Sequence, residues 1–347
     1  MKRQFIRLYI SAFALVCATM GSAQQDAQFS HYMFNNMYTN PGYAGVEGLT
    51  RATLLHRSQW LGYQGTDEGG APTTQLLSLS HPLKILGSPT TNSGVGLGLT
   101  HDLLGPWRIL NLQASYAYHI KMQNGGVLGA GLGVGFLSQS IDGSVLRASE
   151  DDDVIIDGIG SSVATQFKPD VSLGVHYQTR KYSAGLSLRH VGKSEFDFNV
   201  NPDSIASKLA RHLYLTGSYN IFLSQNLLVV PSVVVQSDLA ETSFNYGAVA
   251  SLNNYKYWGG ITLRQSIASQ EAGSASRKLS NDDIVLLIGM SFLSDNELRV
   301  GYSFDLVTRG AAAKNPTSHE IMLSYVIPVN PEDKFTPIRT PRYRKEN

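Results

Sequence analysis

The sequence predicts an all-β protein, a transmembrane antiparallel outer-membrane β-barrel of about 14 strands. Two observations predict this fold class: segments that alternate in polarity every second residue, and connections that alternate between short and long. Only 16% of the 347 residues are Asp, Glu, Lys or Arg, and the mean hydropathy is −0.10. A chain with so few charges does not have the composition of a disordered protein.

Residues 1–23 are typical of a secretory signal peptide that is removed on export. Three basic residues open the segment, Tyr9–Met20 is apolar, and Gly21–Ala23 supplies small residues for cleavage. The apolar run is shorter than a membrane-spanning helix needs. Because the segment holds three positive and no acidic residues, its removal changes the formal net charge from +1 to −2.

The cysteine count excludes thiol chemistry in the mature chain. Cys17 is the single cysteine of the sequence and lies inside the signal, and the bulky Val16 before it does not fit a lipidation site. Without Cys17 the protein can form neither a disulfide nor a thiolate metal site. The near-neutral charge gives no basic excess, so nucleic acid is not a predicted partner.

The strand signal is an alternation of side-chain character that begins at Arg51. Between Leu128 and Phe136, for example, every second residue is apolar and the residues between them are glycines. This period of two is typical of strands with two different faces. The run 226–237 is apolar on both faces and contains Pro231, which predicts a bulge or a break. The fourteen segments centre near residues 51–60, 73–83, 93–102, 108–120, 127–139, 169–180, 182–191, 210–222, 226–237, 241–252, 255–266, 282–293, 297–308 and 317–327.

The connections between these segments fall into two groups by length. The even-numbered ones are mostly short, as at 179–182, 223–226 and 294–296. The odd-numbered ones include the long loops 61–72, 140–168, 192–209, 266–281 and 309–316, although the ninth, near Asp238, is short. Short turns at one end and long loops at the other are typical of outer-membrane barrels, and an even strand number puts both termini on the periplasmic side. A water-soluble sandwich has no reason to sort its loops in this way.

Lipid also accounts for the apolar faces, because a sheet in a bilayer must close on itself to pair every backbone donor and acceptor. Aromatic residues near segment ends suit interfacial girdles, although ordinary sheet aromatics would give the same pattern one by one. These residues are Trp60, Trp107, Tyr116, Tyr118, Tyr182, Tyr255, Tyr257 and Tyr325.

Two segments differ from the predicted barrel at 50–328. Residues 24–49 are rich in Asn, Tyr, Phe and Met and fit neither a strand nor an amphipathic helix, so we expect an N-terminal periplasmic plug or collar. Residues 329–347 hold three prolines and end basic, which predicts an extended periplasmic tail. This tail is either disordered or a docking arm for a periplasmic partner.

The N-terminal residues also resemble a known family. Gln25-Asp26, Tyr32-Met33-Phe34-Asn35 and Asn40-Pro41-Gly42-Tyr43-Ala44-Gly45 are followed by Arg57-Ser58-Gln59-Trp60, Ala71-Pro72-Thr73-Thr74-Gln75 and His81-Pro82-Leu83. This series resembles the start of the PorP/SprF family of type IX secretion proteins, with Gly42 in place of the usual Ala. The first 85 residues match specifically, and the later strands match in pattern.

The resemblance implies an integral outer-membrane protein of Bacteroidetes-type bacteria that supports export or surface anchoring of a cargo protein, often a gliding adhesin. It implies as partners the cargo or its C-terminal targeting domain, periplasmic type IX machinery and outer-membrane lipid. The candidate family-motif and partner-contact residues are Tyr32, Met33, Phe34, Asn35, Asn40, Pro41, Tyr43, Gly45, Gln59, Trp60 and Pro72.

The chain offers little that predicts chemistry, so no catalytic residue, cofactor or metal site is assigned. The histidines are scattered, and His119, His176 and His212 fall on inward faces where hydrogen-bonded networks are expected. The glycines of 129–135 lack the following helix and Lys-Ser/Thr of a phosphate loop, and favour curvature or close packing in the lumen. The acidic run 150–153 is either a solvated loop or a calcium site without the EF-hand spacing. No Gly-x-Ser-x-Gly motif occurs, which favours a protein without enzymatic activity.

Charged residues on predicted inward faces are the candidates for a working lumen. They are Arg57, Arg189, Arg264, Arg299, Asp305 and Glu320. Buried charges are costly unless they are paired or hydrated, so these side chains either form salt bridges that fill the lumen or line a path through it. A filled lumen is favoured. An open one would fit the alternative function, an outer-membrane porin or transporter for small or hydrophobic solutes.

Overall fold

The computed structural model describes residues 26–61, 71–83, 92–145, 163–192, 194–196, 198, 207–238, 240–268, 280–293, 297–308 and 317–327. The predicted signal peptide, the acidic run 150–153 and the predicted tail lie outside the described residues.

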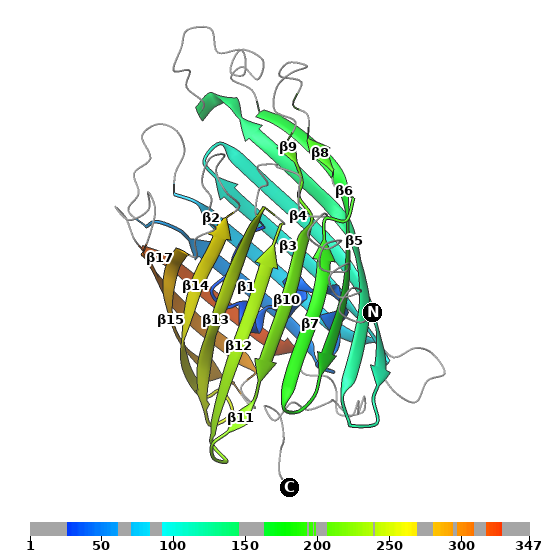
Figure 1. Ribbon diagram of the computed structural model, residues 1–347, viewed down its shortest axis with the longest axis vertical. Helices are drawn as coiled ribbons and strands as arrows, with labels where there is room; N and C mark the ends of the chain where they lie inside the picture. The colour runs from blue at the N-terminus through cyan, green and yellow to red at the C-terminus, as the bar shows by residue number, and fades with distance from the viewer. Residues whose placement is uncertain are drawn as a thin grey trace, which may run out of the picture.

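Fourteen long antiparallel strands form a closed barrel (Figure 1). They are β1 (Thr50–Ser58), β2 (Thr73–Leu83), β3 (Ser93–Leu104), β4 (Trp107–Lys121), β5 (Val127–Asp142), β6 (Val163–Gln178), β7 (Tyr182–Arg189), β10 (His212–Tyr219), β12 (Leu227–Ser237), β13 (Glu241–Leu252), β14 (Tyr257–Ala268), β15 (Ser280–Phe292), β16 (Leu298–Val307) and β17 (Thr317–Ile327). Pairing of β1 with β17 and of β10 with β12 closes the cylinder. The predicted fold class and strand number are therefore confirmed.

Three small strands complete the element order. β8 (Glu195–Phe196) and β9 (Ser207–Lys208) form a separate two-stranded sheet, and β11 (Ile221–Phe222) pairs with β12 below the end of β10. The largest difference between a predicted and an observed strand boundary is at β6, which begins six residues before the predicted residue 169.

Pro231 does not interrupt its strand, so the predicted bulge or break is wrong. β12 runs through it, and the β12–β13 register continues without a shift where Pro231 faces Ala248. On its other side, the β10 pairing ends at Ser232 and the β11 pairing resumes at Val229. Proline has no N–H to donate to a ladder, and Pro231 lies between the stretch that pairs with β10 and the stretch that pairs with β11.

The two ends of the barrel differ in the length of their connections. The end that carries the turns 122–126, 179–181 and 253–256 is called the short-turn end, and the opposite one the long-loop end. Two connections at the long-loop end are nevertheless short, namely the pair Gly105 and Pro106 and the turn near Asp238.

The outer surface is apolar along the described strands. On β4 the outward residues from Leu110 to Ile120 are about half exposed. That stretch is about 34 Å of strand, which at a tilt of about 40° spans about 26 Å, close to the apolar band of outer-membrane barrels. Exposed aromatic rings lie near the short-turn end at Tyr118, Tyr182, Tyr219, Phe222, Tyr257 and Phe292.

Two of the predicted girdle aromatics do not face outward. Tyr255 is 1% exposed and packs in the core cluster of the lumen, and Trp107 packs against Ile141 on the inner face. Tyr255 turns inward because it is the third residue in a row with positive φ in the tight turn before β14. None of the described helices has the length and apolar character of a membrane span.

Candidate functional site

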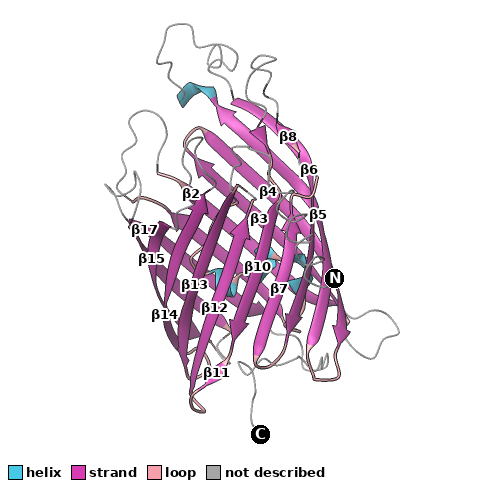
Figure 2. Ribbon diagram, viewed as in Figure 1, coloured by secondary structure: helices cyan, strands magenta, loops and turns pink. Residues whose placement is uncertain are grey.

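The lumen is occupied by the N-terminal segment, residues 26–49, here called the plug segment. It forms three short helical turns, η1 (Tyr32–Phe34), α2 (Asn36–Thr39) and η2 (Pro41–Tyr43), which lie between the walls of the barrel (Figure 2). Local chemistry sets the last turn. The Asn40 side chain accepts a hydrogen bond from the Gly42 N–H at 2.8 Å, and Pro41 supplies the fixed φ of a first helical residue.

One wall meets the plug segment with glycines, here called the glycine cradle: Gly94, Gly96, Gly129, Gly131, Gly174 and Gly185. A Cβ built on Gly131 would lie 2.5 Å from the Gly42 nitrogen, closer than real Cβ atoms come to backbone. Asn40 Nδ2 then donates to the Val175 carbonyl oxygen at 2.8 Å. The alternate glycines of 129–135 are thus explained in part by close packing, because the plug backbone approaches the β5 and β6 backbone directly.

The end of the plug segment is held by a sharp turn at Gly45. Its φ of +68° is in the left-handed region that favours glycine, and a Cβ there would lie 2.7 Å from the Gly94 Cα. Its N–H donates to Ser80 Oγ at 2.8 Å. Beside it, His119 Nε2 lies 2.8 Å from the Ala44 carbonyl oxygen, consistent with a donated hydrogen bond.

Aromatic residues of the plug segment pack near the short-turn end. The Phe34 ring lies 4.7 Å from the Trp258 ring and 6.1 Å from that of Tyr255. The Tyr32 hydroxyl donates to the Ser232 carbonyl oxygen at 3.3 Å and lies 3.1 Å from Ser232 Oγ. This packing buries apolar surface that would otherwise face the lumen.

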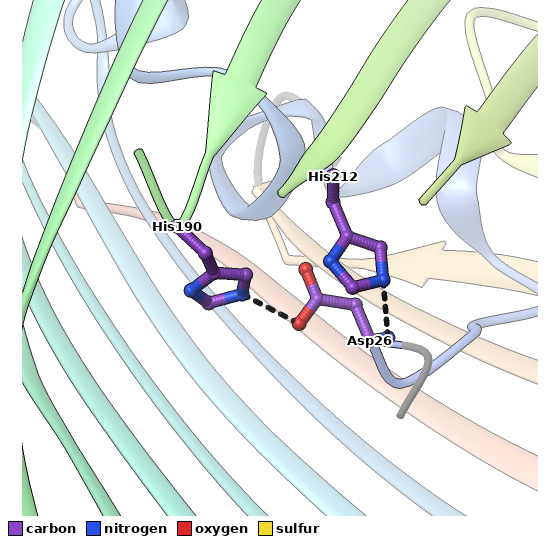
Figure 3. A group of neighbouring side chains, drawn as sticks. All are labelled: Asp26, His190 and His212. Atoms are coloured by element: carbon purple, nitrogen blue, oxygen red, sulfur yellow. Dashed lines mark hydrogen bonds and ion pairs between the residues drawn. The ribbon is translucent and has the colours of Figure 1, made fainter. Parts of the chain in front are cut away.

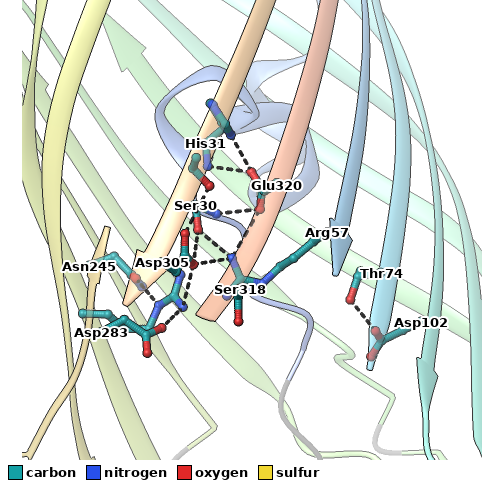
Figure 4. Close-up of polar contacts among 12 residues, drawn as sticks. Ser30, His31, Arg57, Thr74, Asp102, Asn245, Asp283, Asp305, Ser318 and Glu320 are labelled. Carbon is teal, nitrogen blue, oxygen red and sulfur yellow. Dashed lines mark hydrogen bonds and ion pairs between the residues drawn. The ribbon is translucent and has the colours of Figure 1, made fainter. Parts of the chain in front are cut away.

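The wall opposite the cradle meets the plug segment with charges, here called the ionic wall (Figure 4). Glu320 accepts the backbone N–H groups of Ser30 and His31, both at 2.8 Å. Its Oε1 also lies 2.7 Å from His31 Nδ1. Arg57 Nη1 lies 2.6 Å from Asp305 Oδ2 and 3.6 Å from Glu320 Oε2, and it donates to Ser30 Oγ.

The neighbouring inward charges are also paired. Arg264 forms an ion pair with Asp283, and its Nε donates to Asn245 Oδ1 at 2.7 Å. The Arg299 guanidinium lies 4.7 Å from the centre of the buried Tyr255 ring, within the range of a cation–π contact. The desolvation free energy of buried charges of this kind is offset only when partners surround them.

A third cluster fixes the start of the plug segment and is here called the Asp26 clasp. Asp26 Oδ2 lies 2.6 Å from Arg189 Nη1 and accepts from the Tyr214 hydroxyl at 2.8 Å. Asp26 Oδ1 lies 2.9 Å from His190 Nε2, and the Asp26 N–H donates to His212 Nε2 at 3.1 Å (Figure 3).

Protonation in the clasp follows from these partners. Burial alone would raise the pKa of Asp26, but Arg189, His190 and His212 together hold it well below its usual value. Burial disfavours the His190 imidazolium, yet Asp26 on one side and Asp170, 3.0 Å from Nδ1, on the other raise the pKa of His190 to about 9. Near neutral pH, Asp26 is a carboxylate and His190 a cation.

Asp26, His190 and His212 are also close enough to be considered as metal ligands, since their ligating atoms lie within 4.8 Å of one another. Their hydrogen bonds do not fit that role. His190 directs both ring nitrogens at carboxylates, and His212 donates from Nδ1 to the Ala210 carbonyl while its Nε2 accepts the Asp26 N–H. A metal ligand needs a free lone pair, and Arg189 would repel a cation. The clasp is an ion-pair cluster.

Comparison with known proteins decides the family. The family model described as "Type IX secretion system membrane protein PorP/SprF" matches residues 21–325. The chain belongs to the PorP/SprF family. The resemblance of the N-terminal motifs is confirmed, and the protein is a type IX secretion component of the outer membrane.

Other comparisons add little to that family membership. No curated protein matches the chain. Among solved structures, the PorP/SprF chain is similar to the CymD monoaromatic hydrocarbon channel, with 12% identity, a TM-score of 0.45, and coverage of 88% of this chain and 94% of that one. The chain is also similar to a Pseudomonas aeruginosa FadL homologue, with 13% identity, a TM-score of 0.44, and coverage of 83% of this chain and 93% of that one. Its similarity to the Ralstonia pickettii toluene transporter TbuX has 11% identity, a TM-score of 0.42, and coverage of 84% of this chain and 92% of that one.

The PorP/SprF motif residues fall into two separate places. Those from Tyr32 to Gly45 lie in the lumen, where Asn35 Oδ1 accepts from Ser78 Oγ at 3.3 Å and the Tyr43 ring stacks edge-on against His176 at 5.0 Å. The other three predicted residues lie at the long-loop end. There the Gln59 N–H donates to the Pro72 carbonyl at 2.9 Å, and Trp60, at φ 51°, donates its N–H to Ser318 Oγ at 3.3 Å.

All six predicted lumen charges lie in the interior, but sequence reasoning missed several partners. Ser30 and His31 gave no signal, because their contacts with Glu320 join residues about 290 positions apart and come largely from backbone N–H groups. In the sequence, Asp26 stands out only as part of the Gln-Asp pair that opens the family motif. Its position at the start of the one irregular segment was the available clue.

The cavities beside the plug segment are small. Three of them measure about 60, 40 and 20 Å³, enough for one water in the smallest and a few in the largest. Sites for drug-sized ligands are larger, at about 300 Å³ or more. None of these three cavities, which described residues line, has room for a solute of that size.

Proposed function

We propose that this PorP/SprF protein supports the export and surface anchoring of a cargo protein, such as a gliding adhesin, by binding alone and without enzymatic activity. The observation that carries the proposal is the filled lumen. The plug segment is joined to the barrel by the glycine cradle, the ionic wall and the Asp26 clasp. A barrel whose interior is used for internal contacts offers its rims and loops to partners.

The orientation follows the general pattern of such barrels, which turn short connections to the periplasm and long loops to the outside. In this orientation both termini are periplasmic. The long-loop end, with Gln59, Trp60 and Pro72, then faces the exported cargo. Periplasmic type IX machinery would meet the short-turn end and the basic tail.

A gene deletion complemented with the wild-type gene tests the role. We expect loss of surface display of one adhesin while other type IX cargo still leaves the cell, because the protein serves a cargo and not the whole export path. Surface proteolysis followed by immunoblotting measures the display. Unchanged adhesin display in the deletion strain would refute the proposal.

Planar-bilayer conductance separates this role from a porin or transporter. The intact protein should show no large open-channel current, because the plug segment fills the lumen. A variant that lacks residues 24–36 should conduct, since it loses the Asp26 clasp and the contacts to Glu320. Large currents from the intact protein would favour the transporter instead.

A further inference from the structure

An apolar groove lies on the outer face of the barrel, across strands β4 to β7 and β10. It measures about 530 Å³, far more than the cavities beside the plug segment. Its lining side chains include Tyr116, Leu132, Leu173, Leu186 and Leu213, all about half exposed. Sites that hold small ligands measure about 300 to 1,000 Å³, so this groove has the size of a binding site.

The groove is formed at Ala130, an outward residue of β5. Ala130 pairs in register with Tyr118 of β4 and with Val175 of β6. Along β5 itself, the neighbouring residues of the same face are Leu128 and Leu132. A single methyl group therefore stands between four larger side chains, and the outer surface is hollowed there.

The wall behind the groove is held from inside by the plug segment. Gly131 and Gly174 pair in register and line the groove, and they also belong to the glycine cradle. On the lumen side, a Cβ built on Gly174 would lie 2.2 Å from Asn40 Oδ1. Ser187, which also lines the groove, donates to the Thr39 carbonyl oxygen at 2.5 Å. The plug segment thus fixes the backbone that gives the groove its shape.

The position of the groove along the strands places it in the hydrocarbon of the membrane. Tyr116 belongs to the outward stretch from Leu110 to Ile120 that matches the apolar band. Val175 precedes Arg180 of the β6–β7 turn by five residues, which is about 17 Å of strand and, at a tilt of about 40°, about 13 Å of depth. The band is about 25 Å tall, so the groove reaches its middle from the short-turn end. The medium at this depth is lipid, and the ligand that fits an apolar groove there is an acyl chain.

Two cations lie at the short-turn end of the same hairpin. Arg180 and Lys181 are exposed in a tight turn that is fixed by Thr179 Oγ1, which accepts the Lys181 N–H at 3.2 Å. The Arg180 guanidinium carbon lies 5.7 Å from the centre of the exposed Phe222 ring, within the range of a cation–π contact. Within the described part of the chain, neither cation forms an ion pair. Cations at the level of the interfacial aromatic rings attract the phosphates of lipid headgroups.

We propose that the groove and the β6–β7 turn together bind one phospholipid of the leaflet at the short-turn end. One acyl chain lies in the groove over Ala130 and packs against Leu132 and Leu173. The phosphate accepts charge-assisted hydrogen bonds from Arg180 and Lys181. Shape and charge occur together at this place on the barrel, which distinguishes a site from ordinary solvation by lipid. The inference is independent of the cargo role.

Photolabelling of the full chain in vesicles tests the position of the acyl chain. The probe is phosphatidylglycerol with a diazirine midway along one acyl chain, and mass spectrometry of peptides locates the adducts. We expect labelling of Leu173 and Val175 to exceed that of Ile261 on β14 by about fivefold or more, although Ile261 is equally exposed to lipid. Equal labelling at the three positions would show ordinary solvation and overturn the inference.

A variant that fills the groove tests its shape. Ala130→Phe should lower the labelling of Leu173 and Val175 by about fivefold or more, because the new ring occupies the space of the acyl chain. Ala250→Phe is the matched control, since Ala250 is an exposed residue on the outer face of β13 and does not line the groove. Heat-resistant migration in gels checks that both barrels are folded. Labelling that Ala130→Phe leaves unchanged would refute the site.

The headgroup contact is tested by native mass spectrometry of the protein purified in detergent with phosphatidylglycerol. Replacing both cations, Arg180→Gln with Lys181→Gln, should lower the retained phosphatidylglycerol by about tenfold or more. Lys256→Gln is the control, because Lys256 lies in the turn between β13 and β14, away from the groove. Retention that is unchanged in the double variant, or lowered equally by the control, would contradict a phosphate contact at the β6–β7 turn.

Discussion

The plug segment meets two walls of opposite chemistry. At the glycine cradle, contact is made by backbone against backbone, and fit depends on the absence of side chains. At the ionic wall, contact is made by charged side chains such as Arg57 and Glu320 that are buried and satisfied by one another. The first wall fixes position by shape and is indifferent to pH and salt. The second fixes position by charge and depends on every partner being present.

The largest effect is expected from the ionic wall. Arg57→Met removes the cation nearest to the buried carboxylates of Asp305 and Glu320, which should destabilise the barrel by about 3 to 5 kcal/mol. Urea unfolding in lipid vesicles, followed by tryptophan fluorescence, measures the loss. Arg108→Met is the matched control, because its ion pair with Asp142 is exposed and should contribute less than about 1 kcal/mol. Equal losses from both variants would show that the wall is not held by charge.

The glycine cradle should respond to a single methyl group. Gly131→Ala places a Cβ against the Pro41–Gly42 backbone, which cannot yield as a flexible side chain would, at a cost of about 1 to 3 kcal/mol. We expect faster proteolysis of the plug segment at every pH. Gly98→Ala is the control, because its nearest atom, the Gln113 carbonyl oxygen, would lie 4.0 Å from the new Cβ. A plug that stays protected in Gly131→Ala would contradict the role of shape.

The Asp26 clasp should weaken as pH rises. The pKa of His190 is raised to about 9, so its contribution is complete below about pH 6.5 and is lost as pH rises through 9. The lowered pKa of Asp26 keeps its own contribution present above about pH 4 and removes it only in stronger acid. The free energy that protects the plug segment from proteolysis should fall by about 1 to 2 kcal/mol between pH 6.5 and 9. In His190→Gln this slope should disappear, and a persistent slope would point to another group.

The smallest effect is expected from one hydroxyl. Tyr32→Phe keeps the ring and removes the hydrogen bond to the Ser232 carbonyl, which should cost about 1 kcal/mol. Thermal unfolding measured by the loss of heat-resistant migration in gels detects the shift. Tyr219→Phe, whose hydroxyl lies on the outer face, is the control and should change nothing measurable.

The sequence predicts the barrel well because its signal is local. Alternation between Leu128 and Phe136 depends on neighbours two residues apart, and strand bounds came out exact at β2, β13 and β17. The lumen is harder, since its contacts join distant residues. Ser30 and Glu320 are separated by 290 positions, and no periodicity reports such a pair. The alternating glycines of 129–135 are visible in the sequence, but the sequence does not show that the backbone of the plug segment fills the space beside them.

The partners of Ser30 and His31 lie on β17, the last strand of the barrel, and this has a consequence for biogenesis. The plug segment is synthesised before every strand of the barrel, whereas the carboxylate that accepts its amides lies on the last of these strands. Contacts of such long sequence separation form late in folding. Docking of the plug segment therefore requires that the final strand has joined the first. An incompletely assembled barrel leaves that carboxylate without these amide donors and the plug segment open to proteolysis.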